Sequence, residues 1–214
     1  MPEAAIECAR MPAPYLRLTG PRLDLVAATP ELFEAELAGR QAFERLLGVT
    51  VPASWPPDFY DRDAIEQSLQ ALRADEAAAG WWMWYLLRRG ESGEPPLLVG
   101  LCGYKGRPSP EGTVEIGYSV LAEHRRQGYA SEAVELLLAR AFAEPEVRAV
   151  LAETYPELIP SIGVLDKAGF RLSGPGSEER VIRFELPRES YVERHVELGR
   201  MDGQLREGPG ERSE

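Results

Sequence analysis

The residues best suited to chemistry stand together in one short run, formed by Arg125, Arg126, Gln127, Gly128, Tyr129 and Ala130. An alternating apolar stretch precedes this run and an apolar stripe at helical spacing follows it, which predicts a turn from a strand into a helix. A helix N-terminus offers unpaired N–H groups and partial positive charge, and both suit a phosphate. Gly128 permits close backbone approach, and the arginines can add charge-assisted hydrogen bonds. Ser131 could cap the helix or bind the same anion.

A phosphate site at this turn competes with simpler interpretations. A P-loop needs GxxxxGK[ST] and a dinucleotide fingerprint needs GxGxxG, and the chain contains neither pattern around the turn. A single glycine after two arginines, taken alone, favours an ordinary strand-to-helix turn with solvated arginines. The residues of the turn therefore indicate an anion site without naming the anion.

Composition excludes several classes of protein. The chain has 214 residues, enough for one domain with a sizeable core, and its apolar content of 44% is ordinary for a globular protein. The longest apolar run, 81–87, suits a buried strand and is too short for a membrane span. The N-terminus carries no export pattern, so we expect a cytoplasmic protein. A net charge of −11 argues against nucleic acid as partner. It fits a cationic substrate, although solubility explains it equally well.

The cysteines do not indicate a metal or redox site. Cys8 and Cys102 are far apart, no CxxC pattern is present, and the two histidines do not cluster. Two unpaired thiols are the expected state in a cytosolic protein. We therefore predict that the protein uses no metal.

The elements that must position the turn alternate along the chain. Periodicity predicts a strand pair at 15–27 that turns at Gly20 and Pro21, and a helix from Pro30 to Gly48 with Thr29 as its N-cap. The further strands are expected at 81–88, 97–104, 113–121 and 147–154, with a hairpin at 170–173 and 180–186. The further helices are expected at 61–79, 128–143 and 161–168. This order predicts an α/β domain over 15–187, followed by an extension over 188–214 that is partly helical and then disordered.

Three segments in this order resemble a known family. The spacing of Arg125, Gly128 and Ala130 matches the [RQ]xxGx[GA] motif of the GNAT (Gcn5-related N-acetyltransferase) superfamily. Glu115–Tyr118 precedes the motif and Pro160–Phe170 follows it, as in that superfamily. The resemblance covers about residues 16–186 and is greatest to the ribosomal-protein N-terminal acetyltransferases. It implies an acyl-CoA N-acyltransferase fold, with a mixed, mostly antiparallel sheet flanked by helices.

The resemblance also implies a donor site. In the family the fourth and fifth strands splay apart, and the pantetheine arm of acetyl-CoA lies in the gap like an added strand. Backbone groups near Tyr118, Val120 and Leu121 would pair with that arm. The amides of 126–130 would hold the pyrophosphate. An amine would then attack the thioester directly in a ternary complex, with acetyl-CoA as acyl donor.

The candidates for proton transfer are weaker. Glu115 lies on the strand that borders the gap, so it is the candidate base, directly or through water; the alternative is a structural carboxylate paired across the sheet. Ser161 is the candidate proton donor to the thiolate, and the alternative is an N-cap of its own helix. Many relatives have Tyr where this chain has Leu165, and Asn where it has Leu158. Tyr155 is a further hydroxyl with a possible packing role.

The predicted function is transfer of an acetyl group from acetyl-CoA to a primary amine, on a small molecule or a peptide N-terminus. The alternative is a catalytically silent acyl-CoA-binding or regulatory module of the same fold. Trp55 is the tryptophan expected to contact substrate, whereas alternation places Trp82 and Trp84 on one face of a strand and Trp81 on the other, with most of the tryptophans in the core. The segment from Arg188 could pack on a partner subunit, so a homodimer is possible.

Overall fold

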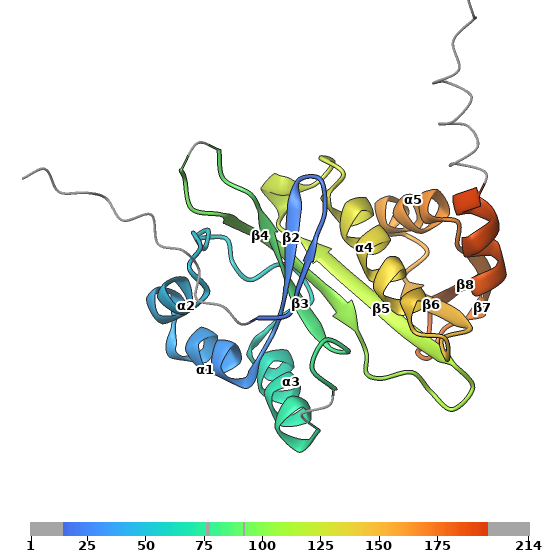
Figure 1. The fold of residues 1–214 in the computed structure, drawn as a ribbon, viewed down its shortest axis with the longest axis horizontal. Coiled ribbons are helices and arrows are strands. Elements are labelled where there is room, and N and C mark those ends of the chain that lie inside the picture. The colour runs from blue at the N-terminus through green and yellow to red at the C-terminus, as the bar shows by residue number, and fades with distance from the viewer. Residues whose placement is uncertain (1–14, 76–77, 92, 197–214) are drawn as a thin grey trace, which may run out of the picture.

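The computed structural model describes residues 15–75, 78–91 and 93–196 (Figure 1). The strands are β1 (Arg17–Thr19), β2 (Leu23–Ala27), β3 (Met83–Arg88), β4 (Leu97–Tyr104), β5 (Thr113–Val120), β6 (Ala149–Thr154), β7 (Arg171–Pro175) and β8 (Ile182–Pro187). The helices are α1 (Pro30–Ala38), α2 (Arg40–Leu47), α3 (Arg62–Ala74), the 3-10 helix η2 (Ala122–His124), α4 (Tyr129–Ala143) and α5 (Ile159–Ala168). Residues 188–196 are also helical.

The eight strands form one mixed sheet in the order β1-β2-β3-β4-β5-β6-β8-β7. Neighbouring strands are antiparallel except β5 and β6, which are parallel. The predicted fold class, a mostly antiparallel sheet flanked by helices, is confirmed. The single parallel pair lies in the middle of the sheet, and the connection between its strands contains the predicted turn and α4.

Helices cover both faces of the sheet, and each face has its own core. Leu25 and Leu86 pack with α4 and α5. Their neighbours in the chain, Val26 and Leu87, pack with α1, α2 and α3. Successive strand residues point to opposite faces, so one strand contributes to both cores. Figure 1 shows α1–α3 grouped beside the N-terminal strands and α4 and α5 beside β6–β8. We call the core between the sheet and α4 and α5 the α4 core. We call the core on the other face the α1–α3 core.

The helical segments differ from prediction at their ends. The single helix expected from Pro30 to Gly48 is two helices, because Gly39 adopts φ 117° and turns the chain between α1 and α2. Thr29 is the N-cap of α1 and its hydroxyl accepts from the N–H of Leu32, as its residue type predicts. The next helix, α3, ends at Ala74 and not near 79.

The tryptophan prediction was partly wrong. Trp81 and Trp84 both belong to the α4 core, whereas Trp82 packs against the α1–α3 core. Strand alternation fails here because β3 begins only at Met83, so the residues before it lie in a turn. Gly100 permits a close approach of β4 to β5, since a Cβ there would lie 2.4 Å from the carbonyl oxygen of Ser119.

The described part of the C-terminal extension packs on its own domain. The guanidinium of Arg188 donates to the carbonyl oxygens of Val147 (2.7 Å) and Phe142 (2.8 Å), beyond and at the end of α4. A cation at a helix C-terminus is favourable because the last carbonyls lack helical partners. The ring of Tyr191 lies 4.5 Å from that of Phe142. The predicted disorder of the tail falls largely beyond residue 196, outside the described residues.

Candidate functional site

The central feature of the site is a divergence between the two parallel strands. β5 pairs with β6 only at 113–116, where Thr113 is opposite Ala149 and Ile116 is opposite Ala152. β5 continues for four residues, Gly117–Val120, which pair with β4 on one side but have no β6 partner within the described sheet. This half of the strand therefore presents an open edge, as the family resemblance implies. An open edge with unpaired N–H and C=O groups accepts an extended ligand as an added strand.

Hydrogen bonds to β4 show which residues face the open edge. Leu121 donates its N–H to Val99, and the carbonyl of Glu115 accepts from Lys105. Peptide groups of alternate residues point to the same side of a strand, so residues 117 and 119 also face β4. Tyr118 and Val120 therefore direct their backbone groups toward the gap. The amide of Leu121 does not, which argues against its predicted contact with the pantetheine arm.

The predicted turn follows the open edge directly. Gly128 is the N-cap of α4 in the left-handed conformation (φ 83°), and Arg126 is left-handed as well (φ 61°). Gly128, and not Ser131, is the N-cap, so the capping prediction for Ser131 was wrong. The first helical bond runs from Glu132 to the carbonyl of Gly128. The amides of the residues between them lack intrahelical acceptors and are suited to an anion.

The side chains of the turn have different surroundings. Arg125 donates from Nε to the carbonyl of Val120 (2.9 Å) and pairs with Asp58 (2.6 Å), so its guanidinium joins the open edge to the loop after α2. Gln127 donates to the carbonyl of Glu123 (3.3 Å). Arg126 is exposed. Both arginines were predicted to contact phosphate. Arg125 would first have to leave its ion pair with Asp58, whereas Arg126 belongs to none of the described ion pairs.

Sequence reasoning missed the contacts that hold this turn in place. Glu132 in α4 accepts hydrogen bonds from the backbone N–H groups of Arg22 (2.7 Å) and Leu23 (2.9 Å) and from Arg22 Nε (2.9 Å). Arg22 also donates to the carbonyl of Gln127 (2.7 Å) and covers the ring of Tyr129. Burial alone would raise the pKa of Glu132, but these hydrogen bonds lower it. The acidic residue in the first turn of α4 was the only available sequence signal.

Glu115, the candidate base, is held in an ion pair. Its Oε1 lies against Nζ of Lys105 and makes no hydrogen bond of normal geometry with the described residues. By strand alternation its side chain lies on the same sheet face as that of Ser119, at the start of the open edge. The ion pair matches the structural-carboxylate alternative, although Lys105 belongs to the turn after β4 and is not a cross-strand partner. For Glu115 to act as a base, the amine must reach its carboxylate either beside Lys105 or through a water molecule.

The hydroxyl of Ser161 lies opposite that of Tyr118. The two oxygens are 3.1 Å apart, and Tyr118 also donates to the carbonyl of Ser161 (3.1 Å). Burial raises the pKa of Tyr118 to about 12, against the opposing hydrogen bond from Ser161. The N-cap of α5 is Leu158, so the N-cap alternative for Ser161 was wrong. Leu165 is buried and offers no proton where many relatives have a tyrosine.

One loop, residues 51–60, closes over this site. The carbonyl of Asp58 accepts from the hydroxyl of Ser119 (3.0 Å), and the exposed ring of Phe59 stacks on Tyr155 (6.5 Å between centroids). Trp55, the loop residue predicted to contact substrate, is partly buried and lines a pocket between α1, α2 and α3. The loop therefore connects that pocket with the ends of β5 and β6.

The described residues outside this site add little chemistry. They contain no group of three or more His, Cys, Asp or Glu side chains arranged to hold a metal ion. Cys102 is buried in the α4 core, which raises the pKa of its thiol far above the usual value. Every helix of the described residues is too short or too polar to cross a bilayer.

Comparison with known proteins gives the site a context. A family model described as the acetyltransferase (GNAT) domain matches residues 22–171. An uncharacterised N-acetyltransferase of Bacillus subtilis strain 168, YjdG, is 29% identical over 150 residues, which are 70% of this chain and 85% of that protein.

Solved structures share the fold at low sequence identity. Mycobacterium smegmatis RimJ in complex with CoA-disulfide superposes with a TM-score of 0.55 and is 20% identical, covering 87% of this chain and 94% of that chain. RimL, described as a ribosomal L7/L12 alpha-N-protein acetyltransferase, superposes with a TM-score of 0.56 at 15% identity, covering 81% and 94%. At these identities the likeness is one of fold.

Proposed function

The chain belongs to the GNAT acetyltransferase family and is an N-acyltransferase, and we propose that it moves an acetyl group from acetyl-CoA to a primary amine. The observation that carries this proposal is the open edge of β5 at 117–120, followed within ten residues by the free amides of α4. Neither feature alone would select this donor.

The residues present fit acetyl-CoA as donor. We assign the backbone groups of Tyr118 and the N–H of Val120 to the pantetheine arm, because these face the gap, whereas the carbonyl of Val120 already accepts from Arg125. The amides of 126–130 and the hydroxyl of Ser131 are assigned to the pyrophosphate. Arg126 adds a charge-assisted contact, and Arg125 does so once its pair with Asp58 is exchanged.

The reaction forms a bond from the amine nitrogen to the carbonyl carbon of the thioester and breaks the bond from that carbon to sulfur. The amine loses a proton and the sulfur gains one. We assign the first proton to Glu115, directly or through water, because it lies two residues before the open edge, with its side chain on the sheet face that Ser119 shares. The second comes from the Ser161–Tyr118 hydroxyl pair, which stays protonated at neutral pH because the pKa of Tyr118 is raised to about 12.

The proposal is tested by thiol release from acetyl-CoA with a panel of primary amines and peptide N-termini. We expect turnover with at least one acceptor, first order in enzyme and without an acyl-enzyme burst. Coenzyme A should also bind the free protein. Binding with complete absence of turnover across the panel would favour the silent acyl-CoA-binding module instead.

A further inference from the structure

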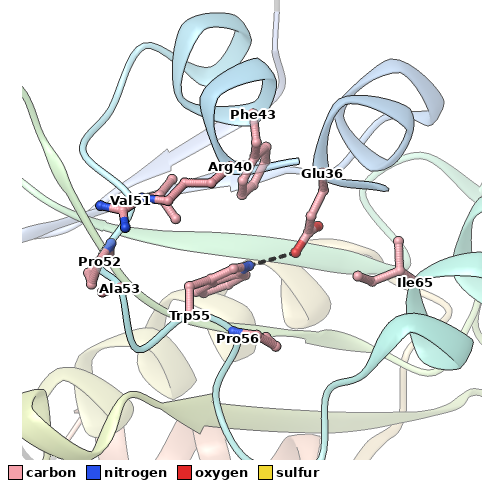
Figure 2. A pocket seen from close by; sticks show the side chains of 9 residues that line it. All are labelled: Glu36, Arg40, Phe43, Val51, Pro52, Ala53, Trp55, Pro56 and Ile65. Carbon is pink, nitrogen blue, oxygen red and sulfur yellow. Dashed lines mark hydrogen bonds between the residues drawn. The ribbon is translucent and has the colours of Figure 1, made fainter. Parts of the chain in front are cut away.

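A pocket of about 230 Å³ lies on the other side of the loop that borders the donor site (Figure 2). It is lined by α1, α2, the start of α3 and residues 51–56, and it is open to solvent on one side. Phe43, Ile65 and Trp55 give it apolar walls, and Glu36 is the one acidic residue of its lining. Figure 2 shows the carboxylate of Glu36 between Trp55 and Ile65, with a hydrogen bond to the indole. The pocket thus combines an apolar interior with one carboxylate.

The carboxylate of Glu36 is hydrogen-bonded but its charge is not balanced. Oε1 accepts from Nε1 of Trp55 (2.7 Å), and Oε2 accepts from the hydroxyls of Tyr60 (3.0 Å) and Tyr85 (2.7 Å). An indole N–H can only donate, so this arrangement suits the ionised carboxylate. Burial raises the pKa of Glu36, and the three hydrogen bonds oppose that effect. All three donors are neutral.

The cation nearest in sequence is already paired. Arg40 lies at the rim of the pocket, half exposed, with its Nε 3.3 Å from Glu44. Within the described ranges, none of the ion pairs includes Glu36. A partly desolvated carboxylate without a counter-ion is costly, and a bound cation offsets that cost.

We infer that this pocket binds an alkylammonium group of the acceptor, so that the acceptor class is aliphatic diamines and polyamines. The ammonium would pair with Glu36, its methylenes would contact Phe43 and Ile65, and the indole face of Trp55 would add a cation–π contact. An anionic ligand is disfavoured because it would lie beside the carboxylate.

One short stretch of the loop borders both this pocket and the donor site. Trp55 lines the pocket, and Asp58, three residues later, contacts Ser119 on the open edge. Three residues of chain span at most about 11 Å between their Cα atoms. The proposal therefore assigns one nitrogen of the acceptor to Glu36 and the other to the open edge, on the two sides of this stretch. This inference rests on the proposed function, since it assigns the second nitrogen to acetyl transfer.

The test compares hexane-1,6-diamine with hexylamine as acceptors, in the wild-type protein, in Glu36→Gln and in Glu34→Gln. Glu34 is the matched control, because it lies two residues away on α1 and pairs on the surface with Arg73. We expect the wild type to prefer the diamine in kcat/KM by roughly tenfold or more, the value of one partly buried charged contact. Glu36→Gln should reduce that preference by roughly tenfold, to what the net charge of the protein alone gives, and Glu34→Gln should keep it.

The outcomes separate the pocket from the reaction. Turnover without preference for the diamine in the wild type, or a preference that is undiminished in Glu36→Gln, overturns the inference and leaves the acetyltransferase proposal standing. If no amine is turned over, calorimetry of hexane-1,6-diamine with the free protein decides. Binding lost in Glu36→Gln supports the pocket without the reaction, and no binding to the wild type overturns it. If Glu36→Gln fails to fold, the wild type still tests the inference, because turnover without preference for the diamine overturns it.

Discussion

Gly128 is constrained both by its backbone conformation and by a neighbouring side chain. Its φ of 83° is in the left-handed region, and a Cβ there would lie 3.1 Å from Nη2 of Arg22. Arg22 in turn supports the turn through Gln127 and Glu132. A side chain at this position therefore disturbs the arrangement that presents the amides.

We predict that Gly128→Ala weakens coenzyme A binding by roughly tenfold, because the turn must shift away from the geometry that suits an anion. Gly93→Ala is the control, since Gly93 is also left-handed (φ 93°) but has open space around its Cβ. Both changes should cost about 1–2 kcal/mol of folding free energy from backbone strain. Titration calorimetry distinguishes them. Equal affinity of the two variants for coenzyme A would contradict the pyrophosphate assignment.

Glu115 and Lys105 can be separated by a pair of substitutions. If Glu115 is the base, Glu115→Gln lowers kcat by roughly 10²–10⁴-fold and alters the acidic side of the pH–rate profile. Lys105→Met removes the same ion pair but keeps the carboxylate, so it should retain most of the rate. Rates of thiol release measured at several pH values test the predictions for both variants. An unchanged profile in Glu115→Gln would assign the carboxylate to structure alone.

At the scale of elements, β5 has two different edges. Its odd-numbered residues from 115 to 121 face β4, and its even-numbered residues beyond 116 face the gap. Within this one strand, the amides that face β4 therefore serve as a control for the amides that face the gap.

We predict that coenzyme A slows amide hydrogen exchange at Tyr118 and Val120, because the pantetheine arm pairs with groups that otherwise face the gap. The amides of Ser119 and Leu121, which face β4, should change little. Exchange measured residue by residue by NMR checks this. Equal slowing at all four amides would indicate general tightening of the sheet instead.

The contact between β2 and α4 depends on one carboxylate. Glu132 is only 10% exposed at its side chain and joins the β1–β2 hairpin to the start of α4. Removal of its charge leaves two backbone N–H groups without a charged acceptor. The same substitution at Glu135 affects a more exposed pair with Arg194 on the same helix.

We predict that Glu132→Gln lowers the free energy of unfolding at neutral pH by about 2 kcal/mol, and Glu135→Gln by less than about 1 kcal/mol. The pKa of Glu132 is lowered in the folded state. Its contribution is therefore complete above the pKa of the unfolded chain and is lost as the pH falls through the folded value. Urea unfolding at neutral and acidic pH tests this. The difference between wild type and Glu132→Gln should shrink on acidification, and a difference that grows would contradict the assignment.

The molecule as a whole has a net charge of −11. A field of this sign raises the local concentration of cations within about a Debye length, roughly 8–10 Å at physiological ionic strength. The proposed diamine carries two positive charges and a monoamine carries one. The whole-molecule charge thus favours the acceptor class that the pocket selects.

We predict that kcat/KM for hexane-1,6-diamine falls more steeply with added salt than kcat/KM for hexylamine. The difference in slope should persist in Glu36→Gln, because it arises from the whole surface and not from one carboxylate. Initial rates at several concentrations of sodium chloride check this. Identical slopes for the two amines would show that the net charge of the protein does not steer the diamine to the site.

Some features of the protein followed from the sequence alone. Local patterns sufficed for the strand at 97–104, for α4 and for the turn at Gly128, because periodicity, caps and glycines act within a few residues. The motif around Arg125 and Gly128, with its two flanking segments, was enough to predict the family.

Tertiary structure decided what depends on residues distant in the chain. The carboxylate of Glu132 meets Arg22 across 110 positions, and Tyr118 meets Ser161 across 43. The pocket around Glu36 needs donors from a loop, from Tyr60 and from β3. No local pattern encodes such contacts, because they form only when packing brings the segments together. The sequence thus determined the fold and the turn at Gly128. The packing determined how that turn is held and left the carboxylate of Glu36 without a cationic partner among the described ion pairs.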